Sequence, residues 1–162
     1  MKAWVLGDDI DTDVIVPGRT MKFGIEEIAR HCLESVSPSF ASSVGKGDFI
    51  VAGRNFGCGS SREQAPGALK YLGVAALVAE SFAGLFYRNA LNLGLAALVC
   101  VEAKRIRDGD RLELDFHNSS IADLTTGENL PFEPIPGHLM EMVRDGGLLP
   151  HLEKRLKCRT TS

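Results

Sequence analysis

The sequence predicts a mixed α/β domain built around parallel strands. Between residues 48 and 101, short apolar runs alternate with segments whose apolar residues recur at helical spacing, the order typical of β-α-β units. From Asp108 onward, apolar and polar residues alternate, as in antiparallel strands with one solvated face. A chain of 162 residues can bury one substantial core, so we expect a single domain over residues 1–162.

The first half of the chain combines strand, helix and loop patterns. The elements expected there are a strand over residues 2–7, a polar loop over 8–20, a helix over 25–36, a strand over 48–53 and a helix over 62–72. The first strand ends at Gly7, and a Pro-Gly turn closes the polar loop. The apolar residues of the segment 25–36 share one face of a helix.

The second half continues the alternation and then changes style. The elements expected there are a strand over residues 74–80, a helix capped by Ser81 and ended by Gly94, a strand over 95–101, a strand over 111–116, a hairpin over 120–134 turning at Thr126-Gly127, and a helical stretch over 137–156 broken at Gly146-Gly147. Successive parallel strands joined by helices favour right-handed crossovers.

Composition excludes several classes of function. A formal net charge of −3 and a pI near 5.8 argue against a general nucleic-acid or anionic-membrane binder. The basic residues near the C-terminus are more typical of a solvated helix face: Lys154, Arg155, Lys157 and Arg159. No apolar run approaches the length of a membrane span, and no signal-peptide pattern follows Met1. We expect a cytoplasmic protein.

The four cysteines stand far apart, with no Cys-x-x-Cys pair: Cys32, Cys58, Cys100 and Cys158. Neither a disulfide framework nor a metal or iron–sulfur site built from this chain alone is expected.

The stretch NFGCGSSREQAP, residues 55–66, carries the strongest chemical signal. Its glycines permit close backbone approach to a ligand, and the helix that follows offers free N–H groups to an anion. Arg62 adds a guanidinium that fits a carboxylate or phosphate fork. The stretch lacks the Gly-Lys-Ser/Thr ending of a P-loop and the third glycine of a dinucleotide fingerprint, so a small carboxylate fits best.

Two other interpretations of this stretch remain open at the level of sequence. Ser60-x-x-Glu63 and Ser61-x-x-Gln64 each have the form of a capping box, in which the serines would only cap a helix. Alternatively, Cys58 could be a nucleophile paired with one of the four histidines (His31, His117, His138, His151), although nothing in the sequence places a histidine beside it.

A cluster of acids lies near the N-terminus at Asp8, Asp9, Asp11 and Asp13. The spacing does not match an EF-hand loop, and Asx-turns account for most such residues. Because acids this close repel one another, at least one is expected to have a cationic partner.

Three blocks together resemble a known family: GDDIDTDVIVPGR, GRNFGCGSSREQAP and ESFAGLFYRNALNLGL, supported by the closing RDGGLLPHLEKRLK. They run in the order found in the small subunits of isopropylmalate dehydratase and homoaconitase, which correspond to the swivel domain of aconitase. The resemblance covers nearly the whole chain. It implies a three-layer β/β/α swivel domain, with a mixed sheet and a parallel β-α-β core, that caps a separate large subunit.

The resemblance also implies a division of labour. The large subunit would carry a [4Fe–4S] cluster acting as Lewis acid, and the two chains would form a heterodimer or heterotetramer. Ser60 matches the serine that accepts the proton from carbon, and Asp13 matches an acidic position that faces the same site. Ser61 and Arg62 match the substrate-binding neighbours. The reaction implied is isomerisation of 2-isopropylmalate to 3-isopropylmalate, in leucine biosynthesis.

Substrate choice in this family is attributed to the loop after the Pro-Gly turn. Here Met21 and Phe23 could contact an isopropyl group, whereas Lys22 could reach an additional carboxylate. Aconitase has an arginine where this chain has Gly24, so tricarboxylates resembling citrate are disfavoured. Isopropylmalate is favoured, with homoaconitate and dimethylmalate as alternatives. A carboxylate-binding or iron-sensing module without catalysis is the hypothesis from another class.

Overall fold

The computed structural model describes residues 1–160 of the protein. Its strands are β1 (Ala3–Val5), β2 (Phe49–Ala52), β3 (Ala76–Ala79), β4 (Ala96–Val99), β5 (Leu112–Asp115), β6 (Ser120–Asp123) and β7 (Asn129–Pro131). Its helices are α1 (Thr12–Ile15), α2 (Ile25–Arg30), α3 (Phe40–Ser43), α4 (Gln64–Tyr71), α5 (Gly84–Asn92), α6 (Gly137–Arg144) and α7 (Leu148–Thr160), with 3₁₀ turns η1 (Gly18–Thr20) and η2 (Ala103–Arg105).

The first four strands form one parallel sheet in the order β1-β2-β3-β4. Helices α4 and α5 connect β2 to β3 and β3 to β4, which confirms the predicted β-α-β core. The sheet's strands read as continuous apolar runs because both of its faces are buried. Because the four strands are parallel, the loops that follow them all emerge at the same edge of the sheet, the carboxyl edge.

The remaining three strands form an antiparallel sheet in the order β5-β6-β7. The predicted hairpin around Thr126-Gly127 is confirmed, with Gly127 at φ +80°. Leu112, Ile121 and Leu130 point into the molecule and alternate with more exposed residues.

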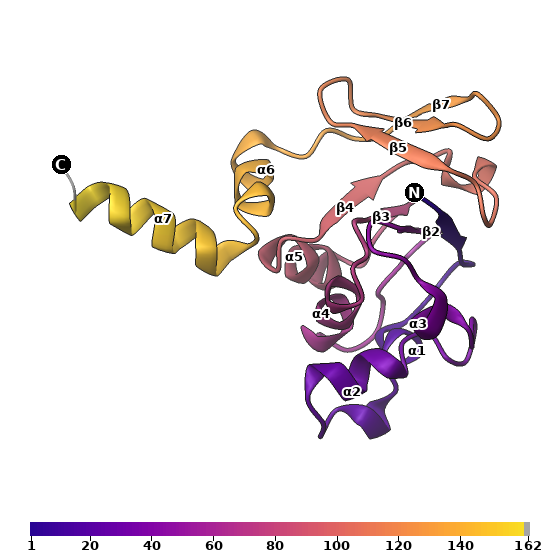
Figure 1. Ribbon diagram of the computed structural model, residues 1–162, viewed down its shortest axis with the longest axis horizontal. Helices are drawn as coiled ribbons and strands as arrows, with labels where there is room; N and C mark the ends of the chain where they lie inside the picture. Colours follow the sequence, from indigo (N-terminus) through magenta and orange to yellow (C-terminus); the bar gives the residue numbers. More distant parts are fainter. Residues whose placement is uncertain (161–162) are drawn as a thin grey trace.

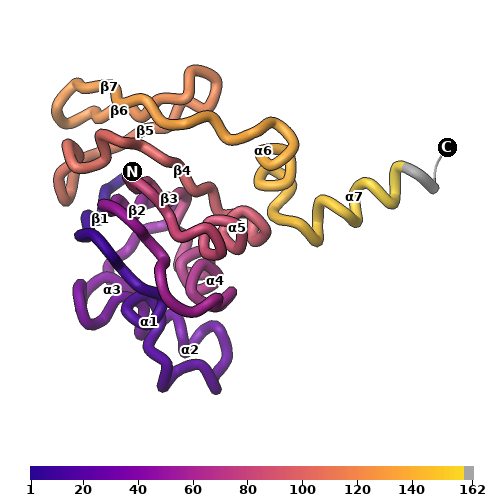
Figure 2. Tube along the Cα trace, turned by 180° about the vertical axis from the view of Figure 1, so that it is seen from behind, coloured from indigo at the N-terminus to yellow at the C-terminus, as the bar shows by residue number. Residues whose placement is uncertain are grey.

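Figures 1 and 2 show three layers from opposite sides: the antiparallel sheet, the parallel sheet, and a layer of helices. The parallel sheet has an apolar core on each face, and alternate residues of β2 point into one or the other. Phe49 and Val51 pack between the sheets, whereas Ile50 and Ala52 pack toward the helices. The β/β/α architecture expected from the family resemblance is confirmed.

The N-terminal segments differ from the sequence prediction in two ways. The predicted polar loop over residues 8–20 contains helix α1, whose N-terminus is capped by Asp11, and the turn η1. The helix predicted over residues 25–36 is wrong beyond Arg30, where α2 ends. Leu33 adopts φ +57°, a left-handed conformation that no helix continues through, yet its side chain is fully buried.

The prediction that Ser81 caps the helix after β3 is also wrong. Helix α5 begins after Ala83, which makes no side-chain cap. Ser81 instead accepts a 2.8 Å hydrogen bond from the backbone N–H of Asn55, so it stabilises the start of the Gly-rich loop. The predicted stop at Gly94 is confirmed, with φ +76°.

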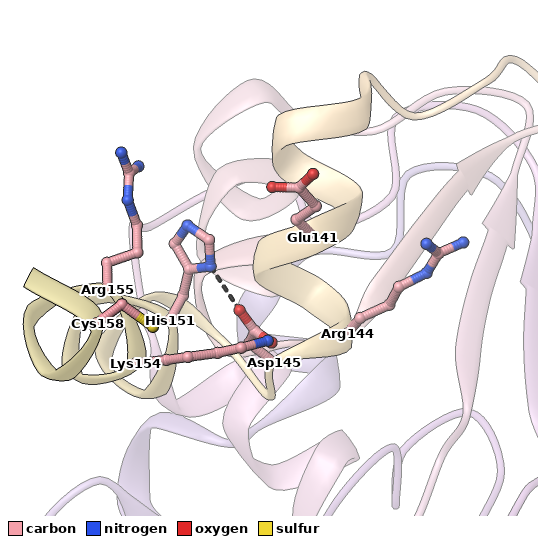
Figure 3. Close-up of a pocket in the computed structure, with 7 residues that line it drawn as sticks. All are labelled: Glu141, Arg144, Asp145, His151, Lys154, Arg155 and Cys158. Atoms are coloured by element: carbon pink, nitrogen blue, oxygen red, sulfur yellow. Dashed lines mark hydrogen bonds and ion pairs between the residues drawn. The ribbon is translucent and has the colours of Figure 1, made fainter. Parts of the chain in front are cut away.

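Helices α6 and α7 meet at the predicted Gly-Gly break, and α7 projects from the body in Figures 1 and 2. Figure 3 shows how they are joined: Asp145 lies 2.7 Å from His151 Nδ1 and 2.6 Å from the Lys154 ammonium. The Lys154 bond, followed by the His151 bond, lowers the pKa of the Asp145 carboxyl. In the described part of the chain, no helix has the length and apolar character needed to cross a bilayer.

Asp48 ties the start of β1 to the start of β2, and this contact predicts how stability depends on pH. Burial raises the pKa of Asp48, but N–H donors from Lys2, Gly45 and the Trp4 indole outweigh it, so the pKa lies below 3.8. A lowered carboxyl pKa contributes stability above pH 3.8 that is lost as the pH falls through the folded-state value.

Asp48→Asn should therefore reduce the free energy of unfolding by about 1–2 kcal/mol at neutral pH. Urea unfolding at pH 7 and at about pH 3 measures it, and the difference between the two proteins should shrink in acid. A difference that is equal at both pH values would contradict the proposed role of the Asp48 charge.

Candidate active site

The Gly-rich loop leaves the carboxyl end of β2 and leads into α4. Its backbone adopts left-handed conformations at three positions, with φ +58° at Asn55, +80° at Gly57 and +94° at Gly59. Gly57 packs so closely on α5 that a Cβ there would lie 2.1 Å from the Phe86 ring. Glycine is required at this point for both reasons, and the aromatic ring fixes the path of the loop.

The loop is held from the other side by the N-terminal segment. Gly57 N–H donates to the Ile10 carbonyl and Thr12 N–H donates to the Cys58 carbonyl, both at 2.8 Å. The Thr12 hydroxyl donates to the Ser60 carbonyl at 3.0 Å. Because Thr12 is only 1 % exposed, water does not compete for this bond. The backbone of Ser60 is therefore fixed by a buried side chain.

Arg62 and Asp13 meet across these two segments. The Arg62 Nη1 atom donates to the Asp13 carboxylate. The Arg62 side chain is 23 % exposed and that of Asp13 is 59 % exposed. In the part of the chain that the structure describes, no protein acceptor occupies the other guanidinium nitrogens. One edge of the fork is thus oriented by Asp13 while the rest remains free to bind an anion.

Ser60 and Ser61 are exposed, and neither hydroxyl has a hydrogen-bond partner among the described residues. The capping alternative is not supported, because α4 begins after Glu63 and has no side-chain cap. Pro66 lies in the first turn, where the lack of an N–H costs little. Ser60, Ser61 and Arg62 thus immediately precede the N-terminal end of α4, where an anion is favoured.

The acids near the N-terminus have separate partners. Asp8 lies 3.4 Å from the Arg54 guanidinium and 3.3 Å from the Lys104 ammonium, which also contacts Glu80. The hydrogen bond from the Arg54 backbone is the main reason that the pKa of Asp8 is lowered. This cluster joins the carboxyl ends of the parallel strands, and Gly53 provides the space it needs.

The other two acids have local roles. Asp9 accepts a 2.9 Å hydrogen bond from the Asn55 amide, and Asp11 caps α1 through the Val14 N–H at 2.7 Å. Among the described residues, no group of three or more His, Cys, Asp or Glu side chains could hold a metal ion. The described residues therefore provide no such group of ligands for a metal site.

Cys58 does not have the surroundings of a nucleophile. Burial, followed by the charges of Asp11 and Asp9, raises the pKa of its thiol, which disfavours the reactive thiolate. His31 and His151 are both engaged with carboxylates elsewhere.

The three residues proposed to contact substrate lie on the segment that follows η1. Met21 is half-buried against the helix-side core, and Phe23 is 48 % exposed. The Lys22 ammonium lies 5.2 Å from the centre of the Phe23 ring. No hydrogen bond or ion pair joins them to residues 60–62 among the described residues, so their role in binding remains a prediction.

Sequence reasoning missed Thr12 and Gly18. A Cβ at residue 18 would lie 3.5 Å from the Asp13 carboxylate and 3.8 Å from the Arg62 guanidinium, so Gly18 lies in contact range of the ion pair. Thr12 stands between two aspartates, where a polar residue looks like part of a solvated turn. Only its burial, which no sequence periodicity signals here, distinguishes it.

A surface pocket lies elsewhere on the molecule. It measures about 690 Å³ and is formed by α6 and α7, where Asp145 is already paired (Figure 3). Arg144 and Arg155 extend away from each other there. Its charges do not converge on one point, and we place the candidate active site at residues 58–62.

A β/β/α domain that presents a serine–arginine loop at the carboxyl edge of its parallel sheet defines a class, that of the aconitase C-terminal domains. The family model described as the aconitase C-terminal domain matches residues 38–103, which include the whole loop.

Comparison with known proteins narrows the class to a family. The chain is 51% identical over 149 residues to 3-isopropylmalate dehydratase small subunit 1 of Archaeoglobus fulgidus, covering 91% of this chain and 92% of that one. It is 48% identical over 157 residues to a methanogen homoaconitase small subunit of Methanothermobacter thermautotrophicus, covering 96% and 91%. The crystal structure of 3-isopropylmalate dehydratase from Methanocaldococcus jannaschii superposes with a TM-score of 0.94, at 41% identity, over 99% of this chain and 96% of that one.

The chain belongs to the family of 3-isopropylmalate dehydratase and homoaconitase small subunits. The family resemblance found in the sequence is confirmed.

The Thr12 hydroxyl yields a test of how the loop is held. Thr12→Val keeps the shape of the side chain but leaves the Ser60 carbonyl without its donor, so we expect a loss of about 0.5–1.5 kcal/mol in the free energy of unfolding. Hydrogen exchange at the amides of Gly57 and Thr12, which bond across this contact, should become faster. Thr12→Ser, which retains a hydroxyl, should exchange as the native protein does. Equal exchange in all three proteins would show that the bond does not fix the loop.

Proposed function

We propose that this chain is the small subunit of a 3-isopropylmalate dehydratase, a hydro-lyase of the aconitase type, active only in complex with a large subunit. The proposal rests on the Gly-rich loop, in which the Ser60 backbone is held by Thr12, the exposed Ser60 hydroxyl has no hydrogen-bond partner among the described residues, and Arg62, two residues on, is paired with Asp13. The identity to relatives that bear this name supports it.

The proposed role of the chain is to move one proton. Ser60, as its alkoxide, takes a proton from the methylene carbon of 2-isopropylmalate while the hydroxyl leaves the neighbouring carbon as hydroxide. The product is an unsaturated diacid. Hydroxide then adds to the former methylene carbon, and the serine returns its proton to the other carbon, which yields 3-isopropylmalate and restores the alkoxide. A [4Fe–4S] cluster on the large subunit would supply the Lewis acid that accepts the hydroxide.

A serine hydroxyl is a weak base at neutral pH, so its anion needs stabilisation. In the proposal, the Arg62 charge and the positive end of α4 supply it, and Asp13 holds the guanidinium in place. Arg62, together with Ser61, also anchors a substrate carboxylate through the part of its fork that Asp13 does not use. Both roles are strongest once a partner chain excludes water from the site.

A second candidate substrate is homoaconitate. The relative at 48% identity that is named a homoaconitase small subunit favours it. The exposed Lys22, which lies between Met21 and Phe23, favours it as well. A lysine offers a point charge to an additional carboxylate, without the fork that an arginine would provide. We rank isopropylmalate first because Met21 and Phe23 give the same segment an apolar character.

Ser60→Ala in the reconstituted two-chain complex should lower kcat by about 10²–10⁴-fold, the usual loss on removing a general base. The substrate is still bound through Arg62, so KM should change little. Anaerobic turnover of isopropylmalate, homoaconitate and dimethylmalate measures both constants. The neighbouring Ser61→Ala variant, which raises KM more than it lowers kcat, is the matched control. Full activity of the Ser60 variant would favour a module that only binds carboxylates.

Arg62→Lys keeps the positive charge but removes the fork. We expect kcat/KM to fall by about 10–100-fold, because the contact with Asp13 and the substrate carboxylate can no longer be made together. The same kinetic assay measures this change. An unchanged kcat/KM would show that the Arg62 fork does not bind the substrate.

A further inference from the structure

Residues 18–25 begin beside the candidate site and end against α4. At the start of the segment, Gly18 lies against the Asp13 and Arg62 pair, within 3.5–3.9 Å of where a Cβ would stand. At its end, the Ile25 Cδ1 atom lies 3.7 Å from the corresponding position of Gly67 on α4, the helix that follows Arg62. Its backbone is a series of turns, with Met21 N–H bonded to the Gly18 carbonyl and Phe23 N–H to the Thr20 carbonyl.

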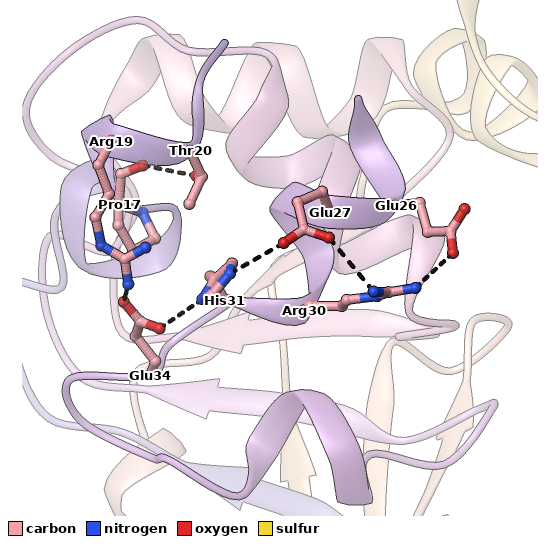
Figure 4. Close-up of polar contacts among 8 residues, drawn as sticks. All are labelled: Pro17, Arg19, Thr20, Glu26, Glu27, Arg30, His31 and Glu34. Atoms are coloured by element: carbon pink, nitrogen blue, oxygen red, sulfur yellow. Dashed lines mark hydrogen bonds and ion pairs between the residues drawn. The ribbon is translucent and has the colours of Figure 1, made fainter. Parts of the chain in front are cut away.

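A row of four paired charged or ionisable side chains runs from Arg19, near the start of this segment, to Glu27, just after its end (Figure 4). Arg19, beside Gly18, pairs with Glu34. Glu34 lies 2.8 Å from His31 Nδ1, and His31 Nε2 lies 3.4 Å from Glu27 on α2. Both ring nitrogens thus face carboxylates. We call Arg19, Glu34, His31 and Glu27 the charge chain.

The turn that carries Glu34 is itself fixed. Leu33 is fully buried and its N–H donates to the Ile15 carbonyl at 3.0 Å, which ties the turn to the end of α1. The His31 hydrogen bond, followed by the Arg19 charge, lowers the pKa of the Glu34 carboxyl, so Glu34 is ionised at neutral pH. Glu34 therefore offers a fixed negative point to which the start of the segment is attached.

The inner and outer parts of this polar network differ. At the centre of the charge chain, the Glu34 and His31 side chains are 34 % and 32 % exposed, and at its ends Arg19 and Glu27 are 59 % and 44 % exposed. The outlying Arg30 and Glu26 side chains are 64 % and 68 % exposed. The Arg30 and Glu26 pair lies within α2 as an i,i+4 contact, and Arg30 also lies 3.4 Å from Glu27, the last member of the charge chain. Among the described residues Glu26 pairs with Arg30 alone, so its substitution is the matched control.

We propose that the charge chain positions residues 18–25 against Arg62 and so sets how closely the site fits the non-reacting part of the substrate. The consequence for catalysis rests on the proposed function, whereas the positioning of the segment does not. Arg19 and Glu34 act through the segment that carries Met21, Lys22 and Phe23, so they are positioning residues that touch no reacting atom.

Glu34→Gln tests the proposal, because it keeps the size of the side chain and removes the charge. In the two-chain complex we expect KM for the preferred substrate to rise by about two- to fivefold, the range for one partly exposed ion pair, with kcat unchanged. Arg19→Gln should have the same effect, and the double variant should be no worse than either single one. Glu26→Gln should match the native protein.

Hydrogen exchange in the isolated chain provides a readout that does not depend on activity. The amides of Met21 and Phe23 should exchange about two- to fivefold faster in Glu34→Gln and Arg19→Gln, and at the native rate in Glu26→Gln. Unchanged exchange and unchanged KM in both inner variants would overturn the proposal. A native complex that turns over none of the substrates would instead overturn the proposed function, and the exchange rates would still decide the positioning of the segment.

Discussion

The candidate site depends on one contact, the binding of the segment around Thr12 to the Gly-rich loop. The segment around Thr12 follows β1 and the Gly-rich loop follows β2, so both begin at the carboxyl edge of the parallel sheet. The strand pairing of the sheet does not extend into the loop. Two backbone bonds, from Thr12 to Cys58 and from Gly57 to Ile10, and the buried Thr12 hydroxyl on Ser60 fix the loop. With the loop fixed, Arg62 reaches Asp13 and the serine hydroxyls remain exposed.

The β-α-β core, the antiparallel hairpin and the Gly-Gly break were predictable because each is encoded locally, by periodicity or by a turn residue. The failures have a common cause. Ser81 looks like a cap in sequence but bonds to Asn55, and the helix after Ile25 stops early because Leu33 buries its side chain from a left-handed turn. In both cases a tertiary contact overrides a local signal. Thr12 is important because its hydroxyl is buried, and its sequence neighbours Asp11 and Asp13 do not indicate that burial.

In the proposed function, this arrangement is half of a catalytic site. Among the described residues, Arg62 keeps donors that Asp13 does not use and the Ser60 hydroxyl has no hydrogen-bond partner, so both are available to a ligand. The hydroxyl of a serine that is exposed to water stays protonated at neutral pH unless nearby groups stabilise its anion. The proposed partner would therefore contribute exclusion of water as well as its own chemistry, and the charge chain behind residues 18–25 would keep the border of the site in place as the two chains close.

The most direct test is a crystal structure of the two-chain complex with 2-isopropylmalate bound. We expect a substrate carboxylate on the Arg62 guanidinium and the Ser60 Oγ atom about 3–3.5 Å from the methylene carbon. A substrate held wholly by the large subunit, with Ser60 far from the reacting carbon, would contradict this expectation.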